Sequence, residues 1–175
     1  MYITRDTVHI CIMRDIVTQV TTKRNLPKPS GPPTQAGRLD DQLCFALYAA
    51  TNAVTRVYRP LLKDIGLTYS QYLVLLILWE RGSQQVGEIA EQLQLATHAV
   101  SPILDRLEEA KLVRRIKDGD DGRVVHVELT KPGAALEAKA AAVQEEVRCS
   151  TMLDPNEVNQ LRADLKALLE QMGDE

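Results

Sequence analysis

The chain contains three cysteines, Cys11, Cys44 and Cys149, and their thiols are the side chains best suited to redox chemistry. An odd and sparse set does not match the disulfide framework of a small secreted protein. We expect a cytoplasmic location, where a cysteine is more often free, catalytic or redox-sensing than structurally bridged. A thiolate can attack a peroxide and pass through a sulfenic acid to a disulfide with a second thiol.

Cys44 stands near the beginning of a predicted helix that runs from Asp40 to Gly66. Asp40 is predicted to cap the N-terminus of this helix. Cys44 then lies about one turn from the positive end of the helix dipole, which favours a thiolate. The alternative interpretation is a small buried apolar side chain. The helix is predicted because apolar residues recur at three- and four-residue steps: Leu43, Leu47, Ala50, Val54, Val57 and Leu61.

Composition places the chain among ordinary soluble globular proteins. It has 175 residues, 45% hydrophobic and 26% charged, with a net charge of −3. Since the overall balance is not basic, DNA binding must rest on local basic patches. No apolar run approaches the roughly 18 residues of a membrane span, so no membrane partner is expected. No Cys/His spacing or glycine-rich loop suggests a metal or another cofactor, so none is expected.

Residues 1–38 are predicted to form an extension outside the main domain. The stretch 26–33 holds four of the eight prolines, and proline-rich sequence forms extended linkers rather than helices. The residues before it are a mobile tail, an added arm or the product of an upstream start, with Met13 as another candidate start. Cys11, within this extension, is interpreted as incidental.

The central part of the chain predicts a mainly α fold with a small β-hairpin. Thr68 and Gln71 have the spacing of a capping box, and the apolar run 72–79 predicts a buried central helix. Helices over about 86–93 and 97–110, joined by three residues, have the helix-turn-helix form. The Val- and Ile-rich segments 112–117 and 123–129 flank a turn at 118–122 and predict a hairpin. We therefore predict a winged helix-turn-helix with its DNA-binding core at 69–130.

Two further helices close the chain, over about 132–149 and from Asp154 onward. Asp154, Pro155 and Glu157 have the pattern of a helix start. The helices in 39–66 and 131–173 carry apolar stripes that so small a core cannot cover, so we expect a homodimer. Its two-fold symmetry suits a palindromic double-stranded operator. The last stripe consists of Val158, Leu161, Leu165, Leu168, Leu169 and Met172.

This order of elements resembles the MarR family of regulators. The segments Leu39-Asp40-Asp41-Gln42-Leu43-Cys44-Phe45-Ala46-Leu47-Tyr48 and Gly66-Leu67-Thr68-Tyr69-Ser70-Gln71-Tyr72-Leu73-Val74-Leu75 are similar to its organic-hydroperoxide-sensing branch. The resemblance covers residues 39–172, within a domain predicted at 39–175. It implies a DNA-binding repressor, rather than an enzyme, that an organic hydroperoxide or a related oxidant releases from its operator.

The resemblance also implies roles for five side chains. Cys44 matches the peroxidatic cysteine, and Tyr58 and Tyr69 match tyrosines that hydrogen-bond its thiol across the dimer. Tyr48 matches an accessory tyrosine. Cys149 matches the resolving cysteine of the two-cysteine subtype, which forms an intersubunit disulfide. The alternatives are a chance surface cysteine at 149 and tyrosines that only fill the core.

On the DNA side, the resemblance matches Asp121 and Arg123 to the Asp-x-Arg of the wing tip, where the arginine enters the minor groove. The recognition helix departs from the branch at Ala96-Thr97-His98-Ala99, where His98 is bulkier than the usual glycine. Thr97 is a candidate for helix capping or phosphate contact. The stretch 111–117 has four positive charges and no acid, which suits phosphates, although any one of them can be an ordinary solvated charge. The candidate DNA-binding residues are Thr97, His98, Ser101, Arg106, Arg114, Arg115, Lys117, Asp121 and Arg123.

Two other functions remain open on sequence alone. One keeps the fold but changes the signal: a small aromatic ligand binds in the cleft between the dimer arms and the reading heads and releases the regulator from DNA. Cys44 would then serve only for packing. The other is a thiol peroxidase that uses Cys44 and Cys149, for which the helix-turn-helix and wing would have no purpose.

Overall fold

The computed structural model of the chain describes residues 37–117 and 124–173. It divides into two units, residues 1–48 and 49–175, and α3 belongs to both. Several predictions lie outside the described residues: the proline-rich extension with Met13 and Cys11, the turn at 118–122, and the wing-tip residues Asp121 and Arg123. The domain boundary after residue 38 stays a prediction.

The described part of the first unit contains a 3-10 turn, η1 (Leu39–Asp41), which is followed by α3 (Leu43–Asp64). The backbone N–H of Asp41 donates to Arg38 O at 3.2 Å and that of Gln42 to Leu39 O at 3.1 Å. Asp40 therefore lies inside the 3-10 turn and not before the α-helix, so its predicted capping role is wrong. The physical reason is that the backbone here forms 3-10 hydrogen bonds between residues three apart, and the α-helix starts only after them.

Helix α4 (Tyr69–Arg81) is the centre of the second unit, as predicted. Its capping box is complete: Gln71 N donates to Thr68 Oγ1 at 3.4 Å and Thr68 N donates to Gln71 Oε1 at 2.8 Å. Gly66, at φ +77°, ends the preceding helical region, a conformation that glycine adopts without strain. Side chains of α4 that are buried include Tyr72, Val74, Leu75, Ile77 and Leu78.

The helix-turn-helix consists of α5 (Val86–Gln92) and α6 (Thr97–Glu109). In the turn between them Gln94 has φ +52°, and Leu95 N donates to Ala90 O at 2.9 Å. Helix α6 packs inward through residues spaced by three and four, a single helical face. Those fully buried residues are Val100, Leu104 and Leu107.

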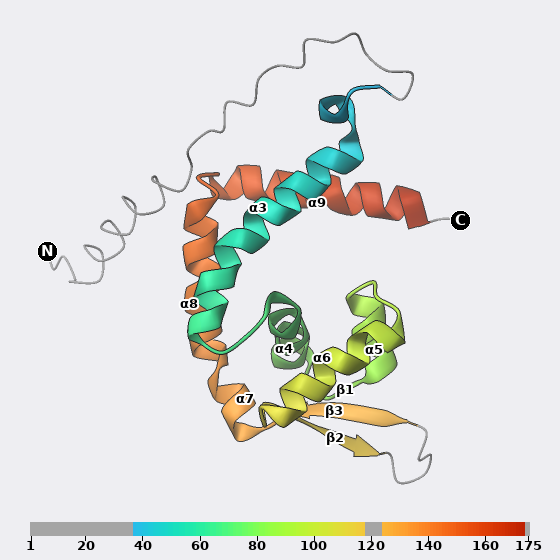
Figure 1. The fold of residues 1–175 in the computed structure, drawn as a ribbon, viewed down its shortest axis with the longest axis vertical. Helices are drawn as coiled ribbons and strands as arrows, with labels where there is room; N and C mark the ends of the chain where they lie inside the picture. The colour runs from blue at the N-terminus through green and yellow to red at the C-terminus, as the bar shows by residue number, and fades with distance from the viewer. Residues whose placement is uncertain (1–36, 118–123, 174–175) are drawn as a thin grey trace, which may run out of the picture. The chain divides into compact units, whose positions relative to one another are not determined.

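The wing strands belong to a three-stranded antiparallel sheet. Strands β2 (Val113–Lys117) and β3 (Val125–Leu129) pair as predicted, and β1 (Gln84–Gln85), which the sequence did not predict, adds to the other edge of β3. Val127 of β3 lies opposite Arg115 on one side and Gln84 on the other. Helices α4, α5 and α6 cover one face of this sheet (Figure 1).

The C-terminal part contains α7 (Lys131–Ala135), α8 (Glu137–Ser150) and α9 (Pro155–Gly173). The single helix predicted over 132–149 is thus two helices. Leu136 keeps helical dihedrals, φ −73° and ψ −18°, but its N–H donates to Gly133 O at 3.3 Å. This three-residue step is a local tightening to 3-10 geometry, which no proline or glycine at 136 announces.

The start of α9 is confirmed in detail. Asp154 Oδ1 accepts from Asn156 N at 2.7 Å and from Glu157 N at 3.0 Å, while Asp154 N donates to Glu157 Oε2 at 2.8 Å. Among the described residues of α9 none is buried, so its apolar stripe is open in a single chain. The most exposed stripe side chains are Leu161, Leu165, Leu169 and Met172.

Within residues 37–117 and 124–173, no single helix is long and apolar enough to cross a membrane. The α3–α4 pair together passes that test of length and composition but is bent by 77° at its break.

Candidate functional site

Cys44 is the second residue of α3, and its side chain is exposed. The alternative of a small buried apolar residue is therefore wrong for a single chain. The first four N–H groups of a helix lack partners within it and give this end a partial positive charge. Tyr48 follows one turn later on the same face and is 65% exposed. The structure thus places a thiol and a phenol side by side on an open helix start.

Tyr58 of α3 and Tyr69 of α4, the two predicted thiol-contacting tyrosines, lie together. Their ring centroids are 5.1 Å apart and their planes are inclined by 50°. Both side chains are half-buried. Burial raises the pKa of Tyr58 and of Tyr69, so both phenols keep their protons at neutral pH. The pair therefore offers hydrogen-bond donors rather than negative charge.

Tyr72 belongs to the same aromatic cluster, although sequence reasoning assigned it only to the core. Its ring centroid lies 5.6 Å from that of Tyr58 and 6.4 Å from that of Tyr69, and Trp79 continues the cluster at 6.5 Å. The signal that could have found it is its spacing, because residues three apart on a helix are neighbours. Tyr69 and Tyr72 have that spacing on α4.

Cys44 and Tyr58 both belong to α3 but are fourteen positions apart. An α-helix rises about 1.5 Å per residue, so positions that far apart are separated by about 21 Å along the axis. A hydrogen bond between these two side chains therefore requires a second copy of the chain. The structure brings Tyr58 and Tyr69 together, whereas Cys44 belongs to the other unit.

Cys149 lies in the last turn of α8, where it is exposed. Its Sγ is 3.7 Å from Glu145 Oε1, as a weak donor to a carboxylate. Arg148 also donates to Glu145, and this hydrogen bond lowers the pKa of the Glu145 carboxyl. Cys149 is thus a solvent-accessible thiol on a helix surface rather than a core residue.

The predicted base-reading residues begin α6. Thr97 is the first helical residue and is exposed, as is His98. The cap position belongs to Ala96, which offers no side-chain hydrogen bond, so a capping role for Thr97 is wrong. The Ser101 hydroxyl donates back to Thr97 O at 3.3 Å. This leaves the start of α6 uncapped, an arrangement in which backbone N–H groups can meet phosphate.

Arg115 of β2 is largely engaged by α6. Its Nη1 lies 2.7 Å from Asp105 Oδ1 and 2.9 Å from Glu108 Oε2, and its Nη2 donates to Ser101 O at 3.2 Å. The backbone N–H of Arg115 also donates to Glu108. These bonds join the wing to the recognition helix over two turns. They also pair the carboxylates of Asp105 and Glu108 on α6 with a positive charge.

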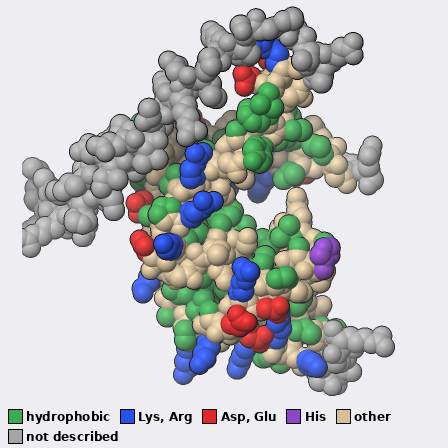
Figure 2. Space-filling view, viewed as in Figure 1, with side chains coloured by type: hydrophobic (Ala, Val, Ile, Leu, Met, Phe, Trp, Pro, Cys, Tyr) green, Lys and Arg blue, Asp and Glu red, His purple; other side chains and the backbone are tan. Residues whose placement is uncertain are grey.

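The remaining basic candidates are more open. Arg114 is 64% exposed and pairs with Glu128, directly opposite on β3, at 2.9 Å. Arg106 and Lys117 are exposed. Lys and Arg side chains lie along the lower margin of the second unit with an acidic group among them (Figure 2), where Figure 1 places β2 and α7. A local basic edge therefore exists on a protein of negative net charge.

Arg115→Ala is expected to lower the free energy of unfolding by about 2 kcal/mol, because it removes charge-assisted hydrogen bonds between β2 and α6. Urea unfolding measures this. The matched control is Lys117→Ala on the same strand, whose exposed side chain should contribute less than about 0.5 kcal/mol. Equal stability of the two variants would show that the Arg115 contacts do not hold the wing.

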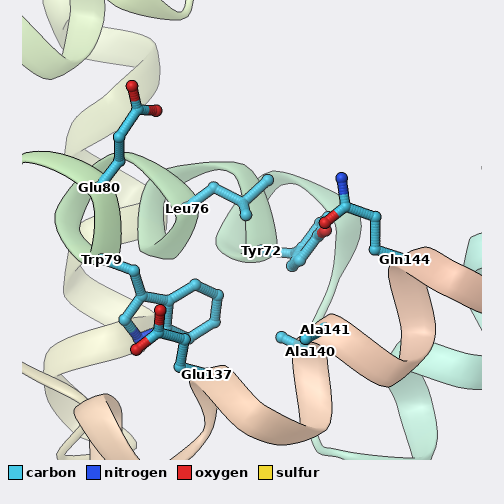
Figure 3. A pocket seen from close by; sticks show the side chains of 8 residues that line it. All are labelled: Tyr72, Leu76, Trp79, Glu80, Glu137, Ala140, Ala141 and Gln144. Atoms are coloured by element: carbon cyan, nitrogen blue, oxygen red, sulfur yellow. The ribbon is translucent and has the colours of Figure 1, made fainter.

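A hollow of about 220 Å³ opens between α4 and α8. Figure 3 shows its aromatic wall, Tyr72 and Trp79 of α4, facing Ala140 of α8, with Glu80 and Glu137 at its edge. The two carboxylates oppose an acidic ligand and suit a neutral or cationic ring.

Comparison with known proteins gives a consistent result. The model of the MarR family matches residues 67–125. The chain is 38% identical over 133 residues to the organic hydroperoxide resistance transcriptional regulator of Bacillus subtilis, which covers 76% of this chain and 90% of the relative. It is 40% identical over 144 residues to the transcriptional regulator TtmR of Methylorubrum extorquens, which covers 79% and 74%.

Solved structures of AbfR from Staphylococcus epidermidis have the same fold. Reduced AbfR bound to DNA has a TM-score of 0.64 at 35% identity and covers 77% of this chain and 94% of its own. AbfR with a disulfide formed has a TM-score of 0.55 at 33% identity and covers 78% and 90%.

Proposed function

Because the chain belongs to the MarR family of transcriptional regulators, we propose that it is a homodimeric repressor released from a palindromic operator when an organic hydroperoxide oxidises Cys44. The relatives are transcriptional regulators rather than enzymes, which removes the thiol-peroxidase interpretation. We therefore propose three properties beyond family membership: oxidation by an organic hydroperoxide, assembly as a homodimer, and repression of transcription.

The observation that carries it is the division of a thiol site along one helix. Cys44 stands exposed at the start of α3, whereas the phenol donors Tyr58 and Tyr69 are grouped around its far end. In an antiparallel pair of α3 helices, the start of one helix meets the end of the other. Each subunit then supplies the donors for its partner's thiolate, and hydrogen bonds to the charged form stabilise it.

The chemistry follows in two balanced steps. The Cys44 thiolate attacks one peroxide oxygen, an S–O bond forms, and the O–O bond breaks. Sulfur loses two electrons and becomes a sulfenic acid, while the alkoxide takes up a proton and leaves as an alcohol. The partner subunit's Cys149 thiolate then attacks the Cys44 sulfur, so that an S–S bond forms and hydroxide leaves as water after protonation.

Exposed apolar surface supports the dimer. In the first unit Leu39 is 62% and Leu43 58% exposed, and in the second unit four side chains of the α9 stripe are exposed: Leu161, Leu165, Leu169 and Met172. Apolar side chains repeated on an exposed helix face are typical of an interface. A disulfide requires Cα atoms within about 7 Å, so bridge formation between subunits constrains their helices and can change the spacing of the two α6 helices.

The relatives support both halves of the proposal. The curated relative from Bacillus subtilis is named for organic hydroperoxide resistance. AbfR has been solved reduced on DNA, overoxidised on DNA and with a disulfide formed. The open start of α6 and the basic edge of the wing are the parts of this chain that would contact operator DNA, with Thr97, His98 and Arg106 on the helix.

The experiment that tests the function is a titration of the protein on its operator with cumene hydroperoxide, with the thiols followed by mass spectrometry. We expect DNA release to rise in step with oxidation of Cys44. Release while Cys44 stays a thiol would overturn the proposal.

Cys149→Ala is expected to abolish the covalent dimer that wild-type protein forms after oxidation. The reason is that the sulfenic acid of Cys44 then lacks its partner thiol, although Cys44 is still oxidised. Non-reducing gel electrophoresis measures the dimer. Cys11→Ala serves as the control and should form the dimer as wild type does. A dimer in the Cys149→Ala variant would assign the bridge to another cysteine.

The aromatic hollow between α4 and α8 favours a second candidate, release by a small aromatic ligand. Its volume of about 220 Å³ lies below the roughly 300 Å³ at which drug-sized pockets begin, so only a small ring fits. This mechanism makes release independent of Cys44.

A further inference from the structure

Arg115 is the member of the basic stretch 111–117 that turns toward the protein. The exposed fraction of its side chain is 26%, against 64% for its neighbour Arg114. Successive side chains of a strand point to opposite faces of the sheet, and the hydrogen bonds of Arg115 with α6 show that its face is the covered one. A guanidinium held there cannot lie on a phosphate without giving up those bonds. Its contribution to a DNA-binding protein therefore requires another explanation.

The contacts of Arg115 with α6 lie at three positions along the helix. Nη2 donates to Ser101 O at 3.2 Å, and Nη1 lies 2.7 Å from Asp105 Oδ1 and 2.9 Å from Glu108 Oε2. Positions 101, 105 and 108 follow one another by four and three residues, which places them on one face of the helix. The fork of a guanidinium can span such a face, whereas the ammonium of a lysine is a single point charge.

The backbone of Arg115 is held by the same helix. Strand β2 lies at the edge of the sheet, whose order is β1-β3-β2, so N–H groups on its outer side have no strand to pair with. The N–H of Arg115 donates to Glu108 Oε1 at 3.1 Å, and Arg115 lies opposite Val127 of β3. Glu108 therefore binds both the backbone and the side chain of Arg115, which fixes the angle between β2 and α6.

The charges around Arg115 also argue against a contact with phosphate. One guanidinium is paired with two carboxylates, Asp105 and Glu108, so the cluster as a whole is negative and repels a phosphate. Two acids on a helix that approaches DNA weaken binding by their charge alone. Their hold on the wing strand gives them a contribution that can offset this repulsion.

We propose that Arg115 is a positioning residue for DNA binding: together with Asp105 and Glu108, it holds wing strand β2 at the angle to α6 at which both contact one duplex. The inference rests on the proposed function, because it requires that α6 and the wing bind operator DNA together. It replaces the direct DNA contact that the sequence predicted for Arg115. Parts that are already arranged in the free protein bind more tightly, because binding does not have to order them.

The test is the affinity of the full-length reduced protein for a fluorescein-labelled duplex that the wild-type protein selects from random sequence, measured by fluorescence anisotropy. The first variant is Asp105→Asn combined with Glu108→Gln, which removes two negative charges and keeps the shapes of both side chains. We expect binding about tenfold weaker, the factor that corresponds to one charge-assisted hydrogen bond. If Arg115 contacted phosphate, this variant would free the guanidinium and bind more tightly. Glu109→Gln, which changes an exposed acid on the same helix, is the matched control and should not weaken binding.

Arg115→Lys is the second variant, because it keeps the charge and loses the fork. We expect it, too, to bind about tenfold more weakly than wild type. The slope of log Kd against log salt concentration should stay unchanged, because the number of phosphates contacted is the same. Loss of a phosphate contact would instead make the slope shallower by about 0.9. Melting curves by circular dichroism set an assay temperature at which every variant is folded, and Arg115→Lys alone suffices if the acid variant does not fold.

Each other result contradicts the proposal in a distinguishable way. Tighter binding by the acid variant, or a shallower salt slope in Arg115→Lys, would make Arg115 a phosphate contact. Wild-type affinity in either variant, with a lower melting temperature, would leave these ion pairs a purely structural role. In both cases the proposed function stands, because the wild-type protein has selected and bound its duplex. If the wild-type protein selects no duplex, the proposed function fails and the role of Arg115 fails with it.

Discussion

Gly133→Ala is expected to lower the free energy of unfolding by about 3 kcal/mol or more, the upper end of the cost of overpacking a core. A Cβ at this position would lie 2.0 Å from Leu112 O and 2.9 Å from Leu112 C. Both are backbone atoms, so no side-chain rotation can relieve the overlap. Gly133 is also buried, and the overlap therefore forces α7 away from the start of β2.

The Leu112 carbonyl cannot shift without further loss. It accepts from Thr130 N at 3.0 Å and from Thr130 Oγ1 at 3.1 Å. Gly133 has its own bonds, with its N–H donating to Thr130 Oγ1 at 3.2 Å and its carbonyl accepting from Trp79 Nε1 at 3.1 Å. The junction joins α4, the wing and α7, so moving one member breaks hydrogen bonds of the others.

Urea unfolding measures the effect, and Gly87→Ala is the matched control. Gly87 lies in α5 with open space where its Cβ would stand, so the same substitution should leave the fold intact and raise stability by up to about 1 kcal/mol. Equal unfolding midpoints for Gly133→Ala and wild type would contradict this prediction. They would show that the backbone at Leu112 and Gly133 can move apart to accept a Cβ without loss of stability.

The parts of the fold that could be predicted have local signals. The capping box at Thr68 and the cap at Asp154 each lie within four residues, and the inward face of α6 follows from helical periodicity alone. Strand β1 could not be predicted, because two residues have no periodicity and Gln84 pairs with Val127 far along the chain. The same holds for Gly133, whose clash partner is Leu112.

In the candidate site, too, some features have local sequence signals and others depend on contacts between distant residues. The position of Cys44 in the first turn of a helix and the basic stretch of β2 could be predicted from sequence patterns, although the cap at Asp40 could not. That Arg115 binds Asp105 and Glu108, rather than only phosphates, depends on how β2 packs against α6. That the ring of Tyr72 on α4 lies against the ring of Tyr58 on α3 depends on how these two helices pack. Sequence patterns identify which residue types share one face of a helix or strand. Which side chains meet between different helices and strands becomes known only from the packed structure.

Cys44→Ser is expected to abolish the response to cumene hydroperoxide while leaving operator affinity unchanged. A serine hydroxyl cannot be oxidised to a sulfenic acid, so the first step of the proposed chemistry is removed outright. The exchange of sulfur for oxygen at an exposed position should change stability by less than about 0.5 kcal/mol. Operator binding by fluorescence anisotropy, with and without hydroperoxide, measures both quantities.

The variant also separates the two candidate signals, with Cys11→Ser as the control that should respond as wild type does. If Cys44→Ser still leaves the operator at the hydroperoxide concentration that releases wild type, the thiol mechanism is wrong. If Cys44→Ser no longer responds to hydroperoxide but a small neutral aromatic compound still releases it from the operator, the hollow between α4 and α8 would be the binding site of a second signal. Loss of the response with no such release would leave Cys44 as the switch. In the proposed site the sulfur of Cys44 is the reacting atom, and Tyr58 and Tyr69 only donate hydrogen bonds to it, so no phenol can substitute for the missing sulfur.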